Sequence, residues 1–245
     1  MKKTLLILAR SKNTLFLMIT VTIIFWAVGL GLFSVTQALS KLPNDLKNGK
    51  FVIDPGHGGV DGGTNSQDFL EKEVNLEVAK KLQSVLAKRG AEVILTREGD
   101  TSPGNTGPAV KRYNYRRALE TRVVIIDKHK PDVFLSVHVN ASYGRSMTSG
   151  AIVYYNETSP NAGLLSEILQ IHLNMVTKKH GFQGHKPKSA DFYILRNTTA
   201  VGAVVEIGFM TNSQEKELLK QDHYQWELAE AMAEGLNEYL AKREP

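Results

Sequence analysis

Short apolar runs alternate with amphipathic helical patterns along most of this chain, and this alternation restricts the folds open to it. The runs have the length and composition of β-strands, and they lie at residues 51–53, 93–95, 133–137, 151–155, 192–195 and 203–205. Strands that alternate with helices form mainly parallel sheets covered by helical layers. We therefore predict an α/β fold, with a mainly parallel twisted sheet flanked by helices.

The helical segments are identified by apolar residues that recur every three or four positions. The first begins at Glu71 and ends at Gly90, and the second runs from about Lys111 to Lys130, where Pro131 stops it. A closing helix is expected at about 221–242. A further helix is expected at about 160–180, and its candidate core positions are Leu164, Leu165, Ile168, Ile171 and Met175.

The first 40 residues have a different character. They contain four basic residues and no acidic one, and residues 13–40 carry no charged side chain. The apolar stretch 15–35 is long enough to cross a bilayer, which takes about 20 residues, although small residues up to Ala38 also suit cleavage by signal peptidase. We therefore predict a signal peptide or membrane anchor at 1–40, which contacts the membrane, and a single folded domain at 41–245.

Most of the formal net positive charge of the chain comes from this leader. The whole chain has 30 basic and 25 acidic residues, and the leader supplies four of the basic ones, so the remainder has a formal net charge of +1. A nearly neutral domain gives no support to nucleic-acid binding, which requires a basic surface. The positive leader end is expected to stay inside the cell, so the domain is expected outside the cytoplasmic membrane.

Two histidines and two glutamates are the candidate site residues. His57 lies in a glycine-rich turn after the first strand, Glu71 lies at a helix start, and His138 and Glu206 lie where later strands are expected to give way to loops. Open α/β sheets place their sites at the carboxyl ends of strands, so these residues can converge. The chain has no cysteine, and two histidines with one glutamate are a common catalytic zinc set that leaves one position open for water. Hydrolysis is the chemistry that this set favours.

Each candidate also has a structural alternative, which for a histidine after a strand is a hydrogen-bonded structural role. Glu71 could be an anion that stabilises a helix amino terminus, and Glu206 could form a buried ion pair with Arg196 or Arg97. His185 lies in a loop with two lysines, where it could meet a substrate carboxylate. The glycine-rich turn is not followed by Gly-Lys-Ser/Thr, which argues against nucleotide binding.

Four motifs together resemble the zinc-dependent N-acetylmuramoyl-L-alanine amidases of bacterial cell walls. In order they are Asp54-Pro55-Gly56-His57-Gly58-Gly59-Val60-Asp61, Glu71-Lys72-Glu73-Val74-Asn75-Leu76, Ser136-Val137-His138-Val139-Asn140-Ala141, and Val205-Glu206-Ile207-Gly208-Phe209-Met210-Thr211-Asn212. The resemblance implies that His57, Glu71 and His138 bind zinc and that Glu206 is catalytic. Residues 41–245 would then be the catalytic domain.

The same resemblance implies a substrate and a setting. The bond is the amide between the lactyl group of N-acetylmuramic acid and L-alanine in peptidoglycan. A short chain with one leader and no wall-binding repeat looks most like the germination-specific amidases, which prepare spore cortex for muramic lactam formation. This implies an extracytoplasmic location, secreted or on the outer face of the cytoplasmic membrane, including the space between the spore membranes. An accessory protein for activation is a further candidate partner.

Two departures and two rival functions accompany the resemblance. Ile126 and Asp127 stand where the family usually has Ala and Asn, and Val201-Gly202 replaces a segment that contains proline before the last motif.

A zinc peptidase that cuts within the stem peptide would use the same site chemistry. A catalytically silent wall-binding protein is the alternative from another class, and the retention of all three ligand types with Glu206 argues against it.

Overall fold

The computed structural model describes residues 45–66, 68–105 and 113–243, which fall within one compact unit. The predicted leader, with its cleavage site, and the expected helix start at Lys111 lie outside these residues. Within the described ranges, no helix has both the length and the apolar character needed to cross a bilayer.

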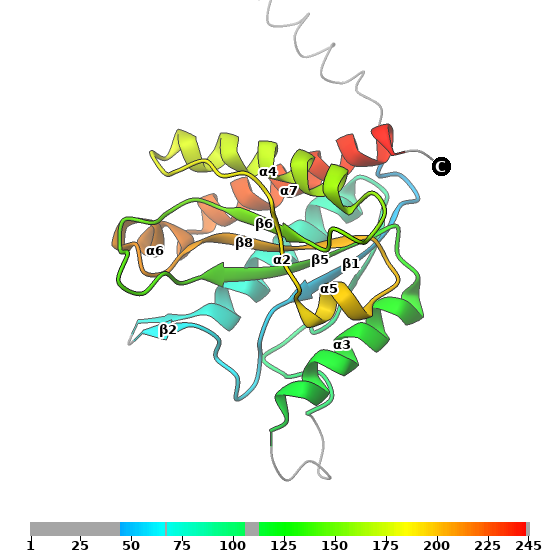
Figure 1. Cartoon of the computed structure of the whole chain (residues 1–245), viewed down its shortest axis with the longest axis horizontal. Coiled ribbons are helices and arrows are strands. Elements are labelled where there is room, and N and C mark those ends of the chain that lie inside the picture. The colour runs from blue at the N-terminus through cyan, green and yellow to red at the C-terminus, as the bar shows by residue number, and fades with distance from the viewer. Residues whose placement is uncertain (1–44, 67, 106–112, 244–245) are drawn as a thin grey trace, which may run out of the picture. The chain divides into compact units, whose positions relative to one another are not determined.

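A sheet of six strands runs through the centre of the described residues (Figure 1). Its strand order is β4-β1-β5-β8-β6-β7, and neighbouring strands are parallel except for β6 and β8. The strands are β1 (Lys50–Pro55), β4 (Glu92–Leu95), β5 (Val133–Asn140), β6 (Ile152–Tyr155), β7 (Lys188–Ser189) and β8 (Gly202–Phe209). The predicted α/β fold with a mainly parallel sheet is confirmed.

Helices cover both faces of this sheet. Figure 1 shows α4 and α7 above the sheet and α3 and α5 below it. The helices are α2 (Glu71–Lys88), α3 (Tyr115–His129), α4 (Ala162–Lys179), α5 (Tyr193–Asn197), α6 (Ser213–Leu219) and α7 (Asp222–Lys242). A small hairpin, β2 (Asn65–Ser66) with β3 (Phe69–Leu70), leads directly into α2.

The two faces of the sheet have unequal hydrophobic cores. On β5, Leu135 and Val137 point into a large core shared with α2, α4 and α7, whereas Phe134 belongs to a small core with α3 and α5. Because side chains alternate along a strand, Ser136 and His138 follow Phe134 on the smaller side. The large core provides most of the buried apolar surface, at about 25 cal/mol per Å². The face with the smaller core instead carries polar residues toward the carboxyl ends of the strands, such as Ser136 and His138 on β5.

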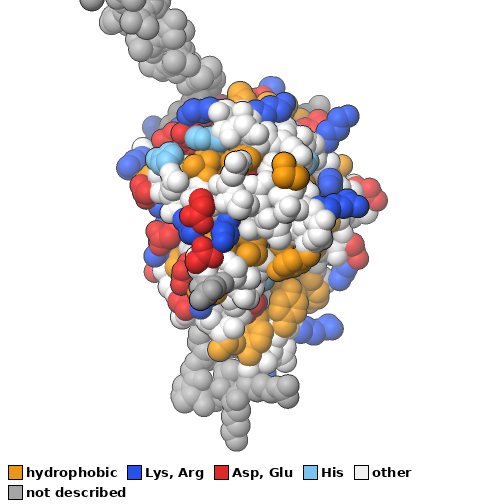
Figure 2. All heavy atoms as spheres, turned by 90° about the vertical axis from the view of Figure 1, so that its left-hand side faces the viewer, with side chains coloured by type: hydrophobic (Ala, Val, Ile, Leu, Met, Phe, Trp, Pro, Cys, Tyr) orange, Lys and Arg blue, Asp and Glu red, His pale blue; other side chains and the backbone are white. Residues whose placement is uncertain are grey.

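Ion pairs connect the β2–β3 hairpin to α6 and to the residue that follows it. Asp68 forms ion pairs with Lys216 at 2.9 Å and with Lys220 at 3.0 Å. Figure 2 faces this side of the molecule and shows acidic and basic side chains lying next to one another. Exposed ion pairs each contribute at most about 1 kcal/mol, so their effect here is to orient the hairpin that precedes Glu71.

Several expected elements differ in the structure. The run 192–195 was expected to be a strand, and it forms the start of helix α5 instead. Periodicity does not distinguish a strand from one buried helical turn in so short a run. Strands β5 and β8 continue to Asn140 and Phe209. His138 and Glu206 therefore lie within strands, rather than at the strand ends where we expected them.

Two helix predictions also need correction. Helix α3 begins at Tyr115, because the side chain of Asn114 caps it by accepting a hydrogen bond from the backbone N–H of Arg117. In α4, Leu165 and Ile168 are buried as expected, but Ile171 and Met175 are 59% and 57% exposed. The apolar stripe of this helix was wider than the face that the sheet and α7 cover.

Candidate metal centre and active site

His57 lies on a turn with unusual backbone geometry, two residues beyond β1. Its φ is 62°, and Gly58 and Gly59 have φ values of 127° and 63°. These values lie in the region that favours glycine. A Cβ at Gly58 would also lie 2.2 Å from the carbonyl oxygen of Thr101. The glycines are therefore needed to bring the backbone of His57 into this position.

Two buried arginines hold this turn in place. The carbonyl oxygens of residues 55–57 all accept hydrogen bonds from Arg97 or Arg122, at distances of 2.6 to 3.0 Å. Arg122 also pairs with the buried carboxylate of Asp54. Hydrogen bonds to charged groups contribute about 1.5–3 kcal/mol each, which is enough to stabilise one residue in a left-handed conformation.

Glu71 lies at the first position of α2, buried, and donors surround its carboxylate. Oε2 accepts from the backbone N–H of Thr64 at 2.7 Å, and Oε1 accepts from the backbone N–H of Val139 at 3.1 Å. The side-chain amide of Asn75 donates to Oε1 at 3.2 Å. The carboxylate is therefore oriented by contacts from three segments of the chain, and it does more than cap its own helix.

His138 reaches Glu71 because the chain has a glycine at position 56. A Cβ at Gly56 would lie 2.1 Å from Cε1 of His138, far inside van der Waals contact. Nδ1 of His138 lies 2.9 Å from Oε1 of Glu71. Nε2 of His57 lies 3.2 Å from the same oxygen. The two imidazole rings meet edge to face, with centroids 4.9 Å apart.

One ligand atom from each of His57, Glu71 and His138 lies within 4.8 Å of the other two. Two imidazole nitrogens and one carboxylate oxygen are a donor set that suits zinc, and three protein ligands leave a fourth tetrahedral position for water or substrate. The predicted residues are thus brought together from three separate segments, in an arrangement that fits this ion.

Neighbouring charges and hydrogen bonds shift the pKa values of Glu71 and His57. Burial alone would raise the pKa of Glu71, but the hydrogen bonds and positive charge offered by His138 and His57 hold that pKa well below its usual range. For His57, burial would lower the pKa, and the carboxylates of Asp61 and Glu71 together raise it to about 9. Glu71 therefore stays ionised, as a metal ligand must be.

Glu206 lies beside this cluster on β8. Its side chain is partly buried, and Oε2 has no hydrogen-bond partner among the described residues. Burial raises the pKa of Glu206 to about 7, with a further contribution in the same direction from Glu71. A carboxyl group with such a pKa suits proton transfer near neutral pH.

The alternative ion pairs for Glu206 do not form within the described residues. Arg97 donates to backbone carbonyls of the His57 turn. Arg196 pairs with Asp191 at 2.5 Å. His185 also lies apart from the cluster, and its Nε2 is 2.8 Å from the carbonyl oxygen of Ser149.

A pocket of about 260 Å³ opens beside the cluster. His57, His138 and Glu206 line one side of it, and α3 and α5 form the other. Sequence reasoning missed this second wall, whose aromatic members are Tyr113, Tyr115, Phe192 and Tyr193. Tyr113 and Tyr115 fell in the predicted helix and Phe192 and Tyr193 in a predicted strand, so aromatic content was their only signal.

Sequence reasoning also gave no role to Asp61. Oδ2 of Asp61 lies 3.0 Å from Nδ1 of His57, on the side of the ring opposite Glu71. Asp61 was part of the glycine-rich motif, and its spacing of four residues from His57 was the only available signal. In a turn that is not helical, this spacing does not by itself predict contact.

Known proteins share this fold and much of this sequence. The model of the N-acetylmuramoyl-L-alanine amidase family matches residues 51–238. The germination-specific N-acetylmuramoyl-L-alanine amidase of Bacillus subtilis is 34% identical over 206 residues, which cover 80% of this chain and 82% of that protein. The N-acetylmuramoyl-L-alanine amidase LytC of the same organism is 33% identical over 208 residues, and the match covers 83% of this chain but 38% of LytC.

Solved structures give the same result. The CwlD amidase of Clostridioides difficile, determined in complex with the GerS lipoprotein, superposes with a TM-score of 0.74 at 30% identity, covering 80% of this chain and 100% of that one. The catalytic domain of CwlV, an N-acetylmuramoyl-L-alanine amidase from Bacillus (Paenibacillus) polymyxa var. colistinus, has a TM-score of 0.67 at 29% identity and covers 80% of this chain and 99% of that domain.

Proposed function

The chain belongs to the N-acetylmuramoyl-L-alanine amidase family, and from this membership we propose that it hydrolyses the amide between the lactyl group of N-acetylmuramic acid and L-alanine in a zinc-dependent reaction. The enzyme class follows from the family. The observation that carries the zinc dependence is the convergence of His57, Glu71 and His138 to within 4.8 Å, beside the unpaired carboxyl oxygen of Glu206.

In this proposal His57, Glu71 and His138 hold the ion. The donor set supports this assignment, since two imidazoles and a carboxylate match a catalytic zinc site with one open position. The bound ion supplies Lewis-acid polarisation of the scissile carbonyl and lowers the pKa of water toward about 7. The hydrogen bonds that Thr64 and Val139 donate to Glu71 keep its carboxylate oriented toward both histidines.

Glu206 acts as the general base in this proposal. Its carboxylate takes a proton from the attacking water as the carbon–oxygen bond forms, and then gives that proton to the leaving nitrogen as the carbon–nitrogen bond breaks. The products are the free lactyl carboxylate and a peptide that begins with L-alanine. No hydrogen bond within the described residues competes for Oε2 of Glu206, which supports this role.

The bond specificity is tested by mass spectrometry of digested peptidoglycan. Incubation with the zinc-loaded chain should release peptides with a free L-alanine amino terminus and leave muramic acid without peptide. Addition of a chelator should abolish both products. Muramic acid that keeps L-alanine, with cuts further along the stem, would assign the chain to the peptidases. Zinc binding with no released peptide would instead indicate a silent wall-binding protein.

We further infer a role in spore cortex maturation. The support is the 34% identity to the germination-specific amidase of Bacillus subtilis over most of both chains. Removal of the peptide would prepare muramic acid for conversion to muramic lactam. Deletion of the gene should then eliminate muramic lactam from cortex, as measured by muropeptide analysis, and expression of a Glu206→Gln variant should not restore it. Cortex with normal lactam content would limit the role to other walls.

An accessory protein and a location complete the proposal. The structure of the CwlD amidase is that of a complex with the GerS lipoprotein, and we propose that a comparable partner assists this chain. The basic leader end supports placement of the catalytic domain outside the cytoplasmic membrane. Protease added to spheroplasts should therefore degrade the domain. A domain that is protected until the membrane is lysed would contradict this orientation.

A further inference from the structure

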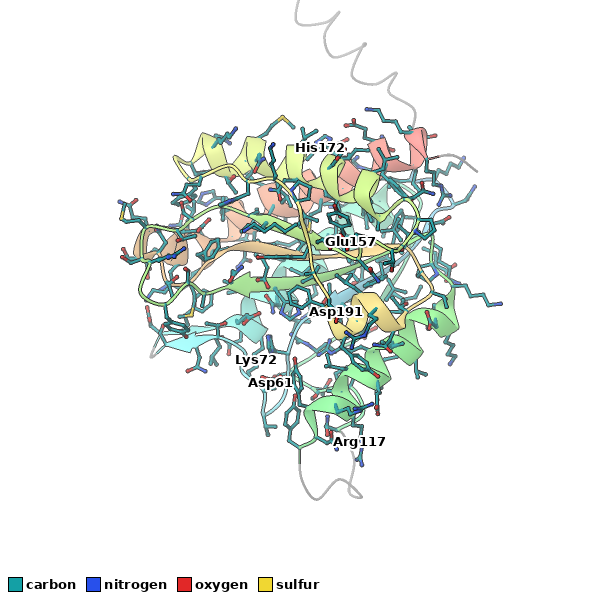
Figure 3. The ribbon with its side chains drawn as sticks, in the orientation of Figure 1. Asp61, Lys72, Arg117, Glu157, His172 and Asp191 are labelled. Atoms are coloured by element: carbon teal, nitrogen blue, oxygen red, sulfur yellow. The ribbon has the colours of Figure 1, made fainter. Side chains whose placement is uncertain are left out.

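Asp61 closes the tight turn that begins just after His57. The backbone N–H of Gly58 donates to the carbonyl oxygen of Asp61 at 2.9 Å, and the reverse bond measures 3.3 Å. Lys72 donates to the carbonyl oxygen of Gly59 at 2.8 Å and so joins this turn to α2. Figure 3 labels Asp61 and Lys72 on these neighbouring segments. The turn therefore carries the carboxylate back toward the imidazole.

The two oxygens of this carboxylate have different partners. Oδ1 accepts from the backbone N–H of Gly63 at 3.1 Å. Oδ2 accepts from the hydroxyl of Tyr113 at 2.9 Å and lies 3.0 Å from Nδ1 of His57. That nitrogen is buried and makes no regular hydrogen bond within the described residues. At 3.0 Å, Oδ2 is nevertheless within hydrogen-bonding distance of an Nδ1–H group.

We propose that Asp61 is a positioning residue, which selects the tautomer of His57 that carries its proton on Nδ1 and leaves Nε2 available to the metal. The inference rests on the function proposed above. Nε2 is the nitrogen that faces Glu71, at 3.2 Å. A carboxylate can only accept, so Oδ2 stabilises a protonated Nδ1 and disfavours the other tautomer. Carboxylates that orient metal-binding histidines raise metal affinity in this way.

The substitution Asp61→Asn isolates this effect. Asparagine keeps an oxygen to accept from Gly63, so the turn is retained. It replaces Oδ2 by an NH₂ group, which donates to an unprotonated Nδ1 and thereby favours the tautomer with the proton on Nε2. In that tautomer the proton occupies the direction of the metal. The matched control is Asp100→Asn, since Asp100 accepts from Gly59 of the same turn at 2.8 Å and does not contact His57.

The test is a zinc titration of the full chain against a chromophoric chelator, together with the thermal midpoint of the metal-free protein. Asp61→Asn should weaken zinc binding about 10- to 100-fold, and a cooperative thermal transition of the metal-free variant shows that it is still folded. Asp100→Asn should leave zinc affinity within twofold of the wild type. An Asp61→Asn affinity within twofold of the wild type would overturn the proposal.

A second measurement does not depend on the stability of a variant. Nitrogen chemical shifts of the His57 ring in the zinc-loaded wild-type chain report which nitrogen is protonated. We expect a protonated Nδ1, and a protonated Nε2 would overturn the proposal. Failure of the underlying zinc assignment is recognised separately, because His57→Ala would then bind zinc as the wild type does. Loss of zinc in His57→Ala with normal affinity in Asp61→Asn would refute the role of Asp61 alone.

Discussion

His138 and Glu206 occupy paired positions on the neighbouring parallel strands β5 and β8. The two side chains therefore leave the sheet on the same face, with their separation set by the backbone hydrogen bonds of the ladder. A shift of one residue in either strand would turn one of these side chains to the opposite face. Their relative position is therefore set by the register of the two strands, which becomes irregular only between His138 and Asn140.

The zinc assignment predicts the effect of removing either histidine. His57→Ala and His138→Ala should each lose bound zinc and amidase activity, because two protein ligands hold the ion much less tightly than three. Elemental analysis of the purified proteins measures the metal. His185→Ala is the matched control, since its ring contacts a backbone oxygen away from the cluster, and it should keep its zinc. Full zinc content in both ligand variants would refute the assignment.

Glu206→Gln should separate catalysis from metal binding. The amide preserves the shape of the side chain but does not accept a proton, so turnover should fall about 100- to 10,000-fold while zinc content stays unchanged. Steady-state kinetics and elemental analysis of the same preparation provide the comparison. Near-normal turnover would give Glu206 a structural role, and loss of zinc would make it a ligand.

Gly56→Ala should disturb the centre through sterics alone. The new Cβ would lie 2.1 Å from the ring of His138, so the ring must move away from Glu71 and zinc affinity should fall at least tenfold. Gly99→Ala is the control, because a Cβ at that position has no neighbour within 4 Å. Equal zinc affinity in the two variants would show that the His138 ring adapts without cost.

Glu215 should make stability depend on pH. It is buried, and burial raises its pKa to about 7 from an ordinary value of 4.5, despite hydrogen bonds from the backbone N–H groups of Phe209 and Gly150. Between these two values the folded state holds a proton that the unfolded state has released. The free energy of unfolding contributed by this group therefore falls by about 1.4 kcal/mol per pH unit as pH rises.

The difference between wild type and Glu215→Gln isolates this contribution, since other titrating groups cancel. Denaturant unfolding at pH 4.5 and pH 7.5 should show the stability of the wild type decreasing relative to the variant by roughly 3 kcal/mol. A difference that does not change with pH would mean that Glu215 keeps its ordinary pKa in the folded state.

Much of the fold and the identity of the four central residues could be predicted from the sequence. Alternation of apolar runs and helical patterns is a local property, and it led to the correct fold class and to helices α2, α4 and α7. His57, Glu71, His138 and Glu206 were selected because their motifs are contiguous in the sequence, and the structure brings all four together. For Glu71, whose position at a helix start has a structural explanation of its own, the resemblance of the four motifs to the amidase family was needed as well.

Other features were decided only by the tertiary structure. Residues 192–195 became helical because α3 offers them an apolar surface, and a run of that length has no periodicity of its own. The orientation of Asp61 depends on a turn closed by Gly58 and on a hydroxyl from Tyr113, which is 52 residues away. The pairing of His138 with Glu206 depends on strand register. Such contacts join distant segments, and their free energies exist only once the sheet has assembled.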